Sequence, residues 1–244
     1  TSFPPATLAK EHFHIPESRG VWDHLQTAAM RSHHNPRQAF EDFLTMSLCG
    51  LAGGTMESEY MELIPRYAEG EKGKRAIDAF PMAFGSLVAA MEKTRSDILG
   101  DIFEGAITHG ENGQFFTPEH VCKMMAQMNL PDNATGQRIY DPCCGSGRML
   151  LGAADVSPQN EFYGKDVDIR CVRMTAINLA LRNLYGYVIQ GNGLTDEQLR
   201  VFRIGFNGKG FVAEVPLVET PRIEPAEREL DESPPTRGTQ LALF

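Results

Sequence analysis

Residues 1–20 show no sustained periodicity and are expected to form an arm, whereas apolar residues recur at helical spacing from about Gly20 onward. Val21, Leu25 and Ala28 share one face of a first helix, and a second apolar pattern follows Asn35-Pro36. This pair predicts the start of the second helix, because Asn is a favoured N-cap and Pro fits the first helical position. Further helices are expected over residues 56–68, 76–92 and 96–107. The pattern predicts an all-helical region over residues 1–108.

The second half of the chain alternates short β-prone runs with helical ones. Strands are expected over residues 137–140, 161–164 and 187–190, with helices after the first two. Asn207-Gly208 is a two-residue hairpin signal and predicts a pair of strands within 201–215. Strands that alternate with helices are typical of an α/β sheet, which we expect over residues 109–216.

A glycine-containing turn links the first expected strand to the helix behind it. The turn reads Asp141-Pro142-Cys143-Cys144-Gly145-Ser146-Gly147. A strand that passes through such a turn into a helix is the first unit of a nucleotide-binding sheet. Glycine lets the backbone approach a ligand, and the helix start offers free N–H groups. Asp141, at the strand end, can accept hydrogen bonds from an amino group or from ribose hydroxyls. The alternative interpretation of the whole segment is an ordinary tight turn.

Four segments, in order, resemble the adenine-N6 DNA methyltransferases, and above all the modification subunits of type I restriction systems. The turn at 141–147 resembles their Asp-Pro-x-x-Gly-Ser-Gly motif, which binds S-adenosylmethionine (SAM). Gly113-Gln114-Phe115-Phe116-Thr117-Pro118 resembles the motif that holds the methionine end of SAM. Residues 97–104 resemble the helix before that motif, and 163–166 resemble the second strand with its ribose-binding acid.

The resemblance implies SAM as the cofactor and a Rossmann-like sheet, and it implies a set of binding residues. The set is Phe116, Thr117, Pro118, Asp141, Pro142, Gly145, Ser146, Gly147, Asp166 and Asn192. Asn192 stands where the family usually has Asp. Its amide can still hydrogen-bond the adenine amino group, but it lacks the negative charge of Asp. Asp166 could instead be a plain helix cap. We expect Asp168 to start the next helix, and Thr117 to cap a helix with Pro118 at its first position.

The family pattern stops before the residues that hold the target base. In the family, Asn or Asp, two prolines and an aromatic residue follow the fourth strand and hold the flipped adenine. The sole candidate, Ser233-Pro234-Pro235-Thr236, has no ring to stack on the base. The remaining strands and a target-recognition domain are not found either, so the sheet is expected to be truncated and the catalytic residues stay unassigned. Two hypotheses follow: a DNA adenine methyltransferase completed by a partner subunit, or an inactive methyltransferase-like binding protein.

The carboxyl end carries a separate signal. Gln240-Leu241-Ala242-Leu243-Phe244 resembles the Gln-Leu-(Ser/Asp)-Leu-Phe peptide by which bacterial proteins dock on the replication sliding clamp. The resemblance implies Gln240, Leu241, Leu243 and Phe244 as partner-binding residues, with leucine and phenylalanine as apolar anchors. Residues 217–244 are rich in acids and prolines and are expected to form a disordered tail. The alternative is that the tail packs on its own domain.

Composition limits the remaining possibilities. The net charge of −9 argues against binding to DNA by bulk electrostatics, but leaves room for a local basic face or a basic partner. No apolar run approaches membrane-spanning length and the amino terminus lacks a signal pattern, so we expect a cytoplasmic protein. Thr1 suggests a removed initiator methionine. Five unpaired cysteines indicate reduced thiols. The cysteine pair at 143–144 has no second pair at metal-ligand spacing, and the histidine pair at 33–34 is expected to be solvated at a helix end, so no metal is expected.

Overall fold

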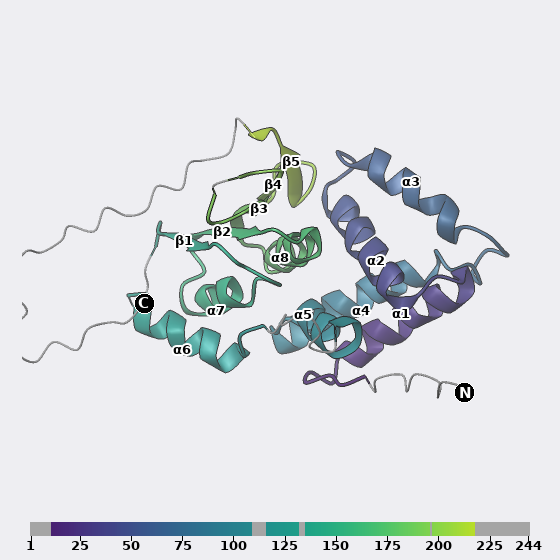
Figure 1. Ribbon diagram of the computed structural model, residues 1–244, viewed down its shortest axis with the longest axis horizontal. Coiled ribbons are helices and arrows are strands. Elements are labelled where there is room, and N and C mark those ends of the chain that lie inside the picture. The colour runs from purple at the N-terminus through teal and green to yellow at the C-terminus, as the bar shows by residue number, and fades with distance from the viewer. Residues whose placement is uncertain (1–10, 109–115, 132–134, 196, 218–244) are drawn as a thin grey trace, which may run out of the picture.

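The computed structural model describes residues 11–108, 116–131, 135–195 and 197–217. Within these ranges a helical region is followed by a sheet and its covering helices (Figure 1). The helices are α1 (Ser18–Ser32), α2 (Pro36–Leu51), α3 (Glu57–Tyr67), α4 (Ala79–Thr94), α5 (Ile98–Ile102), the π-helical turn η1 (Phe103–Thr108), α6 (Glu119–Asn129), α7 (Arg148–Val156) and α8 (Ile169–Leu181). The strands are β1 (Arg138–Asp141), β2 (Glu161–Asp166), β3 (Tyr185–Gln190), β4 (Arg200–Ile204) and β5 (Val212–Val215).

The helical region forms as its periodicity predicts. Asn35 caps α2: its side chain accepts a hydrogen bond from the Gln38 N–H at 2.8 Å, and Pro36 is the first helical residue. The helix expected over 96–107 is present over 98–108, and it changes from α-helical to π-helical after Ile102. In the π-helical turn the Thr108 hydroxyl donates to the Phe103 carbonyl at 3.1 Å. The wider turn occurs next to the segment that was expected to hold the cofactor.

The five strands lie side by side in chain order, β1-β2-β3-β4-β5. The first three are parallel, whereas β4 is antiparallel to β3 and β5 to β4. The hairpin predicted at Asn207-Gly208 is confirmed: the Asn207 side chain accepts from Lys209 N–H and Gly210 N–H at 3.1 and 3.0 Å. The carboxyl ends of β1, β2 and β3 therefore share one edge, while β4 ends at the opposite edge.

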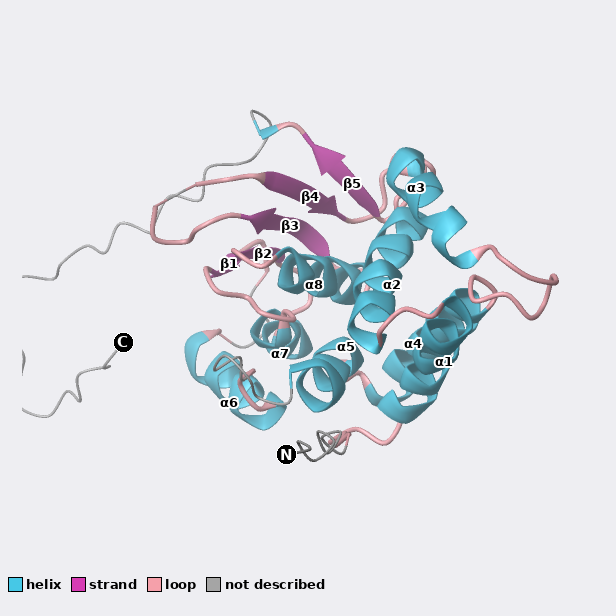
Figure 2. Cartoon of the chain, turned by 45° about the vertical axis from the view of Figure 1, so that its right-hand side comes forward, coloured by secondary structure: helices cyan, strands magenta, loops and turns pink. Residues whose placement is uncertain are grey.

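The sheet and its helices form two layers, with the helical region beside them. Helices α7 and α8 lie along one face of the sheet, and α6 packs on the outer side of α7 (Figures 1 and 2). Helix α2 packs against α8, so it joins the helical region to the sheet. The predicted α/β class, with a helical region ahead of a Rossmann-like sheet, is confirmed.

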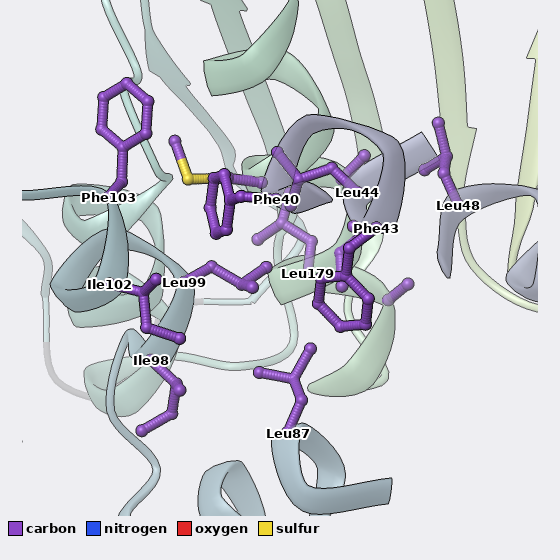
Figure 3. Close-up of a cluster of buried hydrophobic side chains, with 14 of the residues drawn as sticks. Phe40, Phe43, Leu44, Leu48, Leu87, Ile98, Leu99, Ile102, Phe103 and Leu179 are labelled. Carbon is purple, nitrogen blue, oxygen red and sulfur yellow. The ribbon is translucent and has the colours of Figure 1, made fainter. Parts of the chain in front are cut away.

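One hydrophobic core runs through both regions. Its buried side chains extend from Val21 in α1 to Val212 in β5. Figure 3 shows part of it, where Phe40 and Leu44 of α2 gather with Leu99 of α5 and Leu179 of α8. All four of these side chains have no exposed surface. The helical region and the sheet consequently stabilise each other.

Several sequence predictions concern residues outside the described ranges. These are the first part of the expected methionine-holding motif (113–115), the proline pair at 234–235 and the clamp-like peptide at 240–244. Among the helices that the structure does describe, none has the length and apolar character needed to span a bilayer.

Candidate cofactor-binding site

The glycine turn stands at the carboxyl end of β1, as predicted. Gly145 and Gly147 both have left-handed backbones, with φ of 56° and 86°. A Cβ at position 145 would lie 2.7 Å from the Phe116 ring, and one at position 147 would lie 3.0 Å from Thr175. The side chains of Phe116 and Thr175 therefore occupy the space beside these two glycines. Gly147 is also the N-cap of α7, whose first N–H groups face this edge of the sheet.

Two aspartates flank the turn at the ends of neighbouring parallel strands. Asp141 ends β1 and accepts from the Cys143 N–H at 3.0 Å. Asp166 ends β2 and accepts from the Gly145 N–H and the Asp168 N–H, each at 2.9 Å. Asp166 therefore holds the glycine turn onto β2, while Asp168 caps α8 through the Arg170 N–H, as predicted.

The electrostatic environment of these aspartates favours a positively charged ligand. Burial raises the pKa of the Asp141 carboxyl, and the negative charge of Asp166 raises it further. Burial likewise raises the pKa of Asp166, and the nearby Asp168 adds to the effect. Because a like charge opposes the ionised form of each carboxylate, a positively charged group nearby would favour that form.

The loop after β3 reaches the same edge. The Gly191 N–H donates to the Asp166 carbonyl at 2.9 Å, and a Cβ at Gly193 would lie 2.7 Å from the Pro142 carbonyl oxygen. Between these glycines, the Asn192 side chain is half-buried and accepts from the Leu194 N–H at 2.9 Å. The structure therefore brings Asn192 beside the turn that carries Asp141, as the sequence pattern requires.

Phe116 covers the glycine turn. Its ring stacks on Phe103 with 5.8 Å between ring centres and an interplanar angle of 18°. The Arg148 guanidinium lies 5.4 Å from the centre of the Phe116 ring. The ring thus lies close to Gly145, held by aromatic and cation–π contacts.

Thr117 and Pro118 lie exposed beyond Phe116. The predicted N-cap at Thr117 is wrong: α6 begins at Glu119, Pro118 occupies the cap position with ψ of 139°, and no side chain caps this end. Thr117 is one residue too far from the helix to accept from its first N–H groups. Its carbonyl instead accepts from Arg148 at 3.4 Å.

Ser146 turns away from the cofactor edge. Its hydroxyl is fully buried and donates to Asp97 at 2.5 Å. Asp97, Arg148 and Asn178 form a polar group around it that the sequence interpretation did not assign to the site. The sequence shows only that Asn178 is a polar residue within the otherwise apolar run of α8, whereas its burial is seen in the structure.

The hydrogen-bond acceptors at this edge match the polar groups of SAM. SAM carries a sulfonium, an ammonium, ribose hydroxyls and an adenine amino group, and Asp141, Asp166 and Asn192 supply acceptors for such groups. Across the part of the chain that the structure describes, no cluster of three or more His, Cys, Asp or Glu residues could hold a metal ion.

The fourth strand does not bring a base-holding group to this edge. Ile204, at the end of β4, pairs with Gly186 near the start of β3, whereas Arg200 at its start pairs with Gln190. The loop after β4 consequently lies at the edge opposite the glycine turn.

Comparisons with known proteins place these features in a family context. Residues 94–207 match the model of the N-6 DNA Methylase family. The chain is 28% identical over 104 residues to the type I restriction enzyme MpnII methylase subunit of Mycoplasma pneumoniae, covering 38% of this chain and 19% of that protein. It is 28% identical over 139 residues to the MjaIX methylase subunit of Methanocaldococcus jannaschii, covering 51% of this chain and 24% of that protein. The chain thus spans about a quarter or less of these relatives' length.

A solved structure is also similar. It is the type I restriction-modification system methyltransferase subunit from Streptococcus thermophilus, with 16% sequence identity and a TM-score of 0.37. The match covers 69% of this chain and 56% of that one.

Proposed function

Because residues 94–207 belong to the N-6 DNA methylase family, we propose that this chain binds SAM at the edge formed by the glycine turn, Asp166 and Asn192. It would then supply the cofactor-binding part of a DNA adenine-N6 methyltransferase. The observation that carries the proposal is the pair of partly buried carboxylates, Asp141 and Asp166, on either side of the turn. Their environment favours a cation, and SAM is one.

The target adenine would be held by a partner polypeptide. Base methylation requires the flipped adenine to face the methyl group, with its amino group held by hydrogen bonds and its ring stacked. The loop after β4 is at the wrong edge for this role, because β4 runs antiparallel to β3. A net charge of −9 also suits a protein that meets DNA through a partner. The complex would act in the cytoplasm.

The second candidate is a catalytically inactive protein that keeps the methyltransferase fold and is tethered to the sliding clamp. Two features favour it: the absence of a base-holding tetrapeptide and the clamp-like peptide at residues 240–244. Both candidates predict SAM binding by a preserved site. They differ in whether any partner restores methyl transfer.

Calorimetric titration with SAM tests the shared proposal. Asp166→Ala removes one carboxylate and the acceptor for the Gly145 N–H, so SAM affinity should fall about tenfold or more. Asp155→Asn is the matched control, because Asp155 lies at the far end of α7 and pairs with Arg95 and Arg182. It should bind SAM as the wild type does. Absence of heat with the wild-type chain, for both SAM and its demethylated product, would overturn the proposed cofactor.

A further inference from the structure

Asp97, at the start of α5, lies at the centre of a buried polar network. It has no exposed surface. Its carboxylate accepts from the Ser146 hydroxyl at 2.5 Å, the Asn178 amide at 2.8 Å, the Gly100 N–H at 2.9 Å and the Arg148 guanidinium at 3.0 Å. Four donors around one buried carboxylate offset the cost of removing its charge from water.

The first branch of this network shapes the glycine turn. Ser146 lies between the two left-handed glycines, so its hydrogen bond to Asp97 fixes the middle of the turn. Asn178 donates to both the Asp97 carboxylate and the Ser146 carbonyl, at 2.8 and 2.9 Å. The side chain and the backbone of Ser146 are therefore both tied to the same carboxylate.

The second branch positions Phe116. Arg148 donates to Asp97 through Nε at 3.0 Å and to Glu104 through Nη2 at 3.1 Å. Burial alone would lower the pKa of Arg148, but the charges of Asp97 and Glu104 outweigh it and raise the pKa. Glu104, on the π-helical turn, accepts from the Phe116 N–H at 2.6 Å. The Phe116 backbone and the Arg148 guanidinium beside its ring are thus linked to Asp97.

The third branch fixes the start of α6. The backbone N–H of Asp97 donates to the Glu119 carboxylate at 2.8 Å. Glu119 is the first residue of α6 and directly follows Thr117 and Pro118. The two segments assigned to the cofactor, 116–118 and 141–147, come from different parts of the chain. Both are held by one residue of the helical region.

We infer that Asp97 is the positioning residue of the cofactor site: it holds the glycine turn through Ser146 and the covering ring of Phe116 through Arg148 and Glu104. The effect of Asp97 on SAM binding rests on the proposed function. The effect of Asp97 on the glycine turn does not depend on any ligand. Removal of the carboxylate charge should loosen the turn and weaken cofactor binding together.

The test compares Asp97→Asn with Asp42→Asn. Asp42 is a second buried carboxylate, 5% exposed, which accepts from Tyr67 and Gln38 at 2.7 and 3.0 Å within the helical region. Both variants should melt at lower temperatures. Amide exchange, measured by mass spectrometry over residues 143–148, should accelerate in Asp97→Asn alone, and its SAM affinity should fall about tenfold or more. Unchanged exchange and affinity in a folded Asp97→Asn would overturn the inference.

Arg148→Lys provides a second variant if Asp97→Asn fails to fold. Lysine keeps the charge, but it cannot bridge Asp97 and Glu104 with the planar fork that arginine uses. Exchange over 143–148 should again accelerate and SAM binding should weaken, and wild-type values for both would contradict the positioning role. If the wild-type chain binds no SAM, the proposed function fails, while the exchange measurement still decides whether Asp97 holds the turn.

Discussion

Gly145→Ala tests whether Phe116 covers the glycine turn. Gly145 has φ of 56°, a conformation that costs a residue with a Cβ about 1–2 kcal/mol. The added methyl carbon would also lie 2.7 Å from the Phe116 ring, well inside van der Waals contact. The ring would therefore have to move away from Phe103 and Arg148.

The cost of that movement follows from the contacts that are lost. An aromatic pair contributes about 0.5–1.5 kcal/mol beyond its buried area. A cation–π contact at a partly exposed site contributes about 0.5–1 kcal/mol. We therefore expect Gly145→Ala to lower the free energy of unfolding by about 2–4.5 kcal/mol in total.

Gly136→Ala is the control that separates the steric clash with Phe116 from the backbone cost. Gly136 has φ of 68° and no atom within 4 Å of the added carbon, so only the backbone cost of about 1–2 kcal/mol applies. Urea unfolding followed by circular dichroism should separate the two variants by about 1–2.5 kcal/mol. SAM affinity should fall in Gly145→Ala and stay unchanged in the control. If both variants unfold at the same urea concentration, Phe116 does not rest on the turn and the packing argument is wrong.

Three further predictions concern pH, catalysis and the tail. The pKa values of Asp141 and Asp166 are raised in the folded chain, so SAM affinity should fall as the pH decreases through these pKa values and the carboxylates are protonated. The contribution of the two groups to the free energy of unfolding should instead be lost as the pH rises through the same values. If neither carboxylate contacts the ligand, calorimetry across acidic pH will show a SAM affinity that is independent of pH. The purified chain should transfer no tritiated methyl groups to DNA, and robust incorporation that persists in Ser233→Ala would mean that the base is held elsewhere. Leu243→Ala with Phe244→Ala should abolish sliding-clamp binding in surface plasmon resonance and leave the melting temperature unchanged; a melting temperature several degrees lower would instead indicate that the tail packs on its own domain.

The sequence was sufficient where structure depends on neighbouring residues. Asn35 caps α2 through an N–H three positions away, and Asn207-Gly208 closes its hairpin with donors two and three positions from Asn207. Asp168 caps α8 in the same local way. Such contacts are encoded in short patterns that a reader of the sequence can identify.

The network around Asp97 could not be predicted, because it depends on tertiary packing. The side chains that donate to its carboxylate lie 49, 51 and 81 residues away in the chain. The resemblance identified the segment that contains Asp97, but not that this residue meets Asn178 behind the glycine turn. The predicted cap at Thr117 fails because Pro118 has an extended ψ, so that α6 starts at Glu119.

The continuous core makes the chain's single tryptophan a reporter of the whole molecule. Trp22 is 1% exposed in α1, where its indole N–H donates to Glu11 at 2.6 Å. Because α1 belongs to the same core as the sheet, melting of the sheet should disturb the indole and change its fluorescence. A ligand that binds the native state raises the temperature of that change by mass action. Cofactor occupancy should therefore be readable, without a label, from a helix that the cofactor has no need to contact.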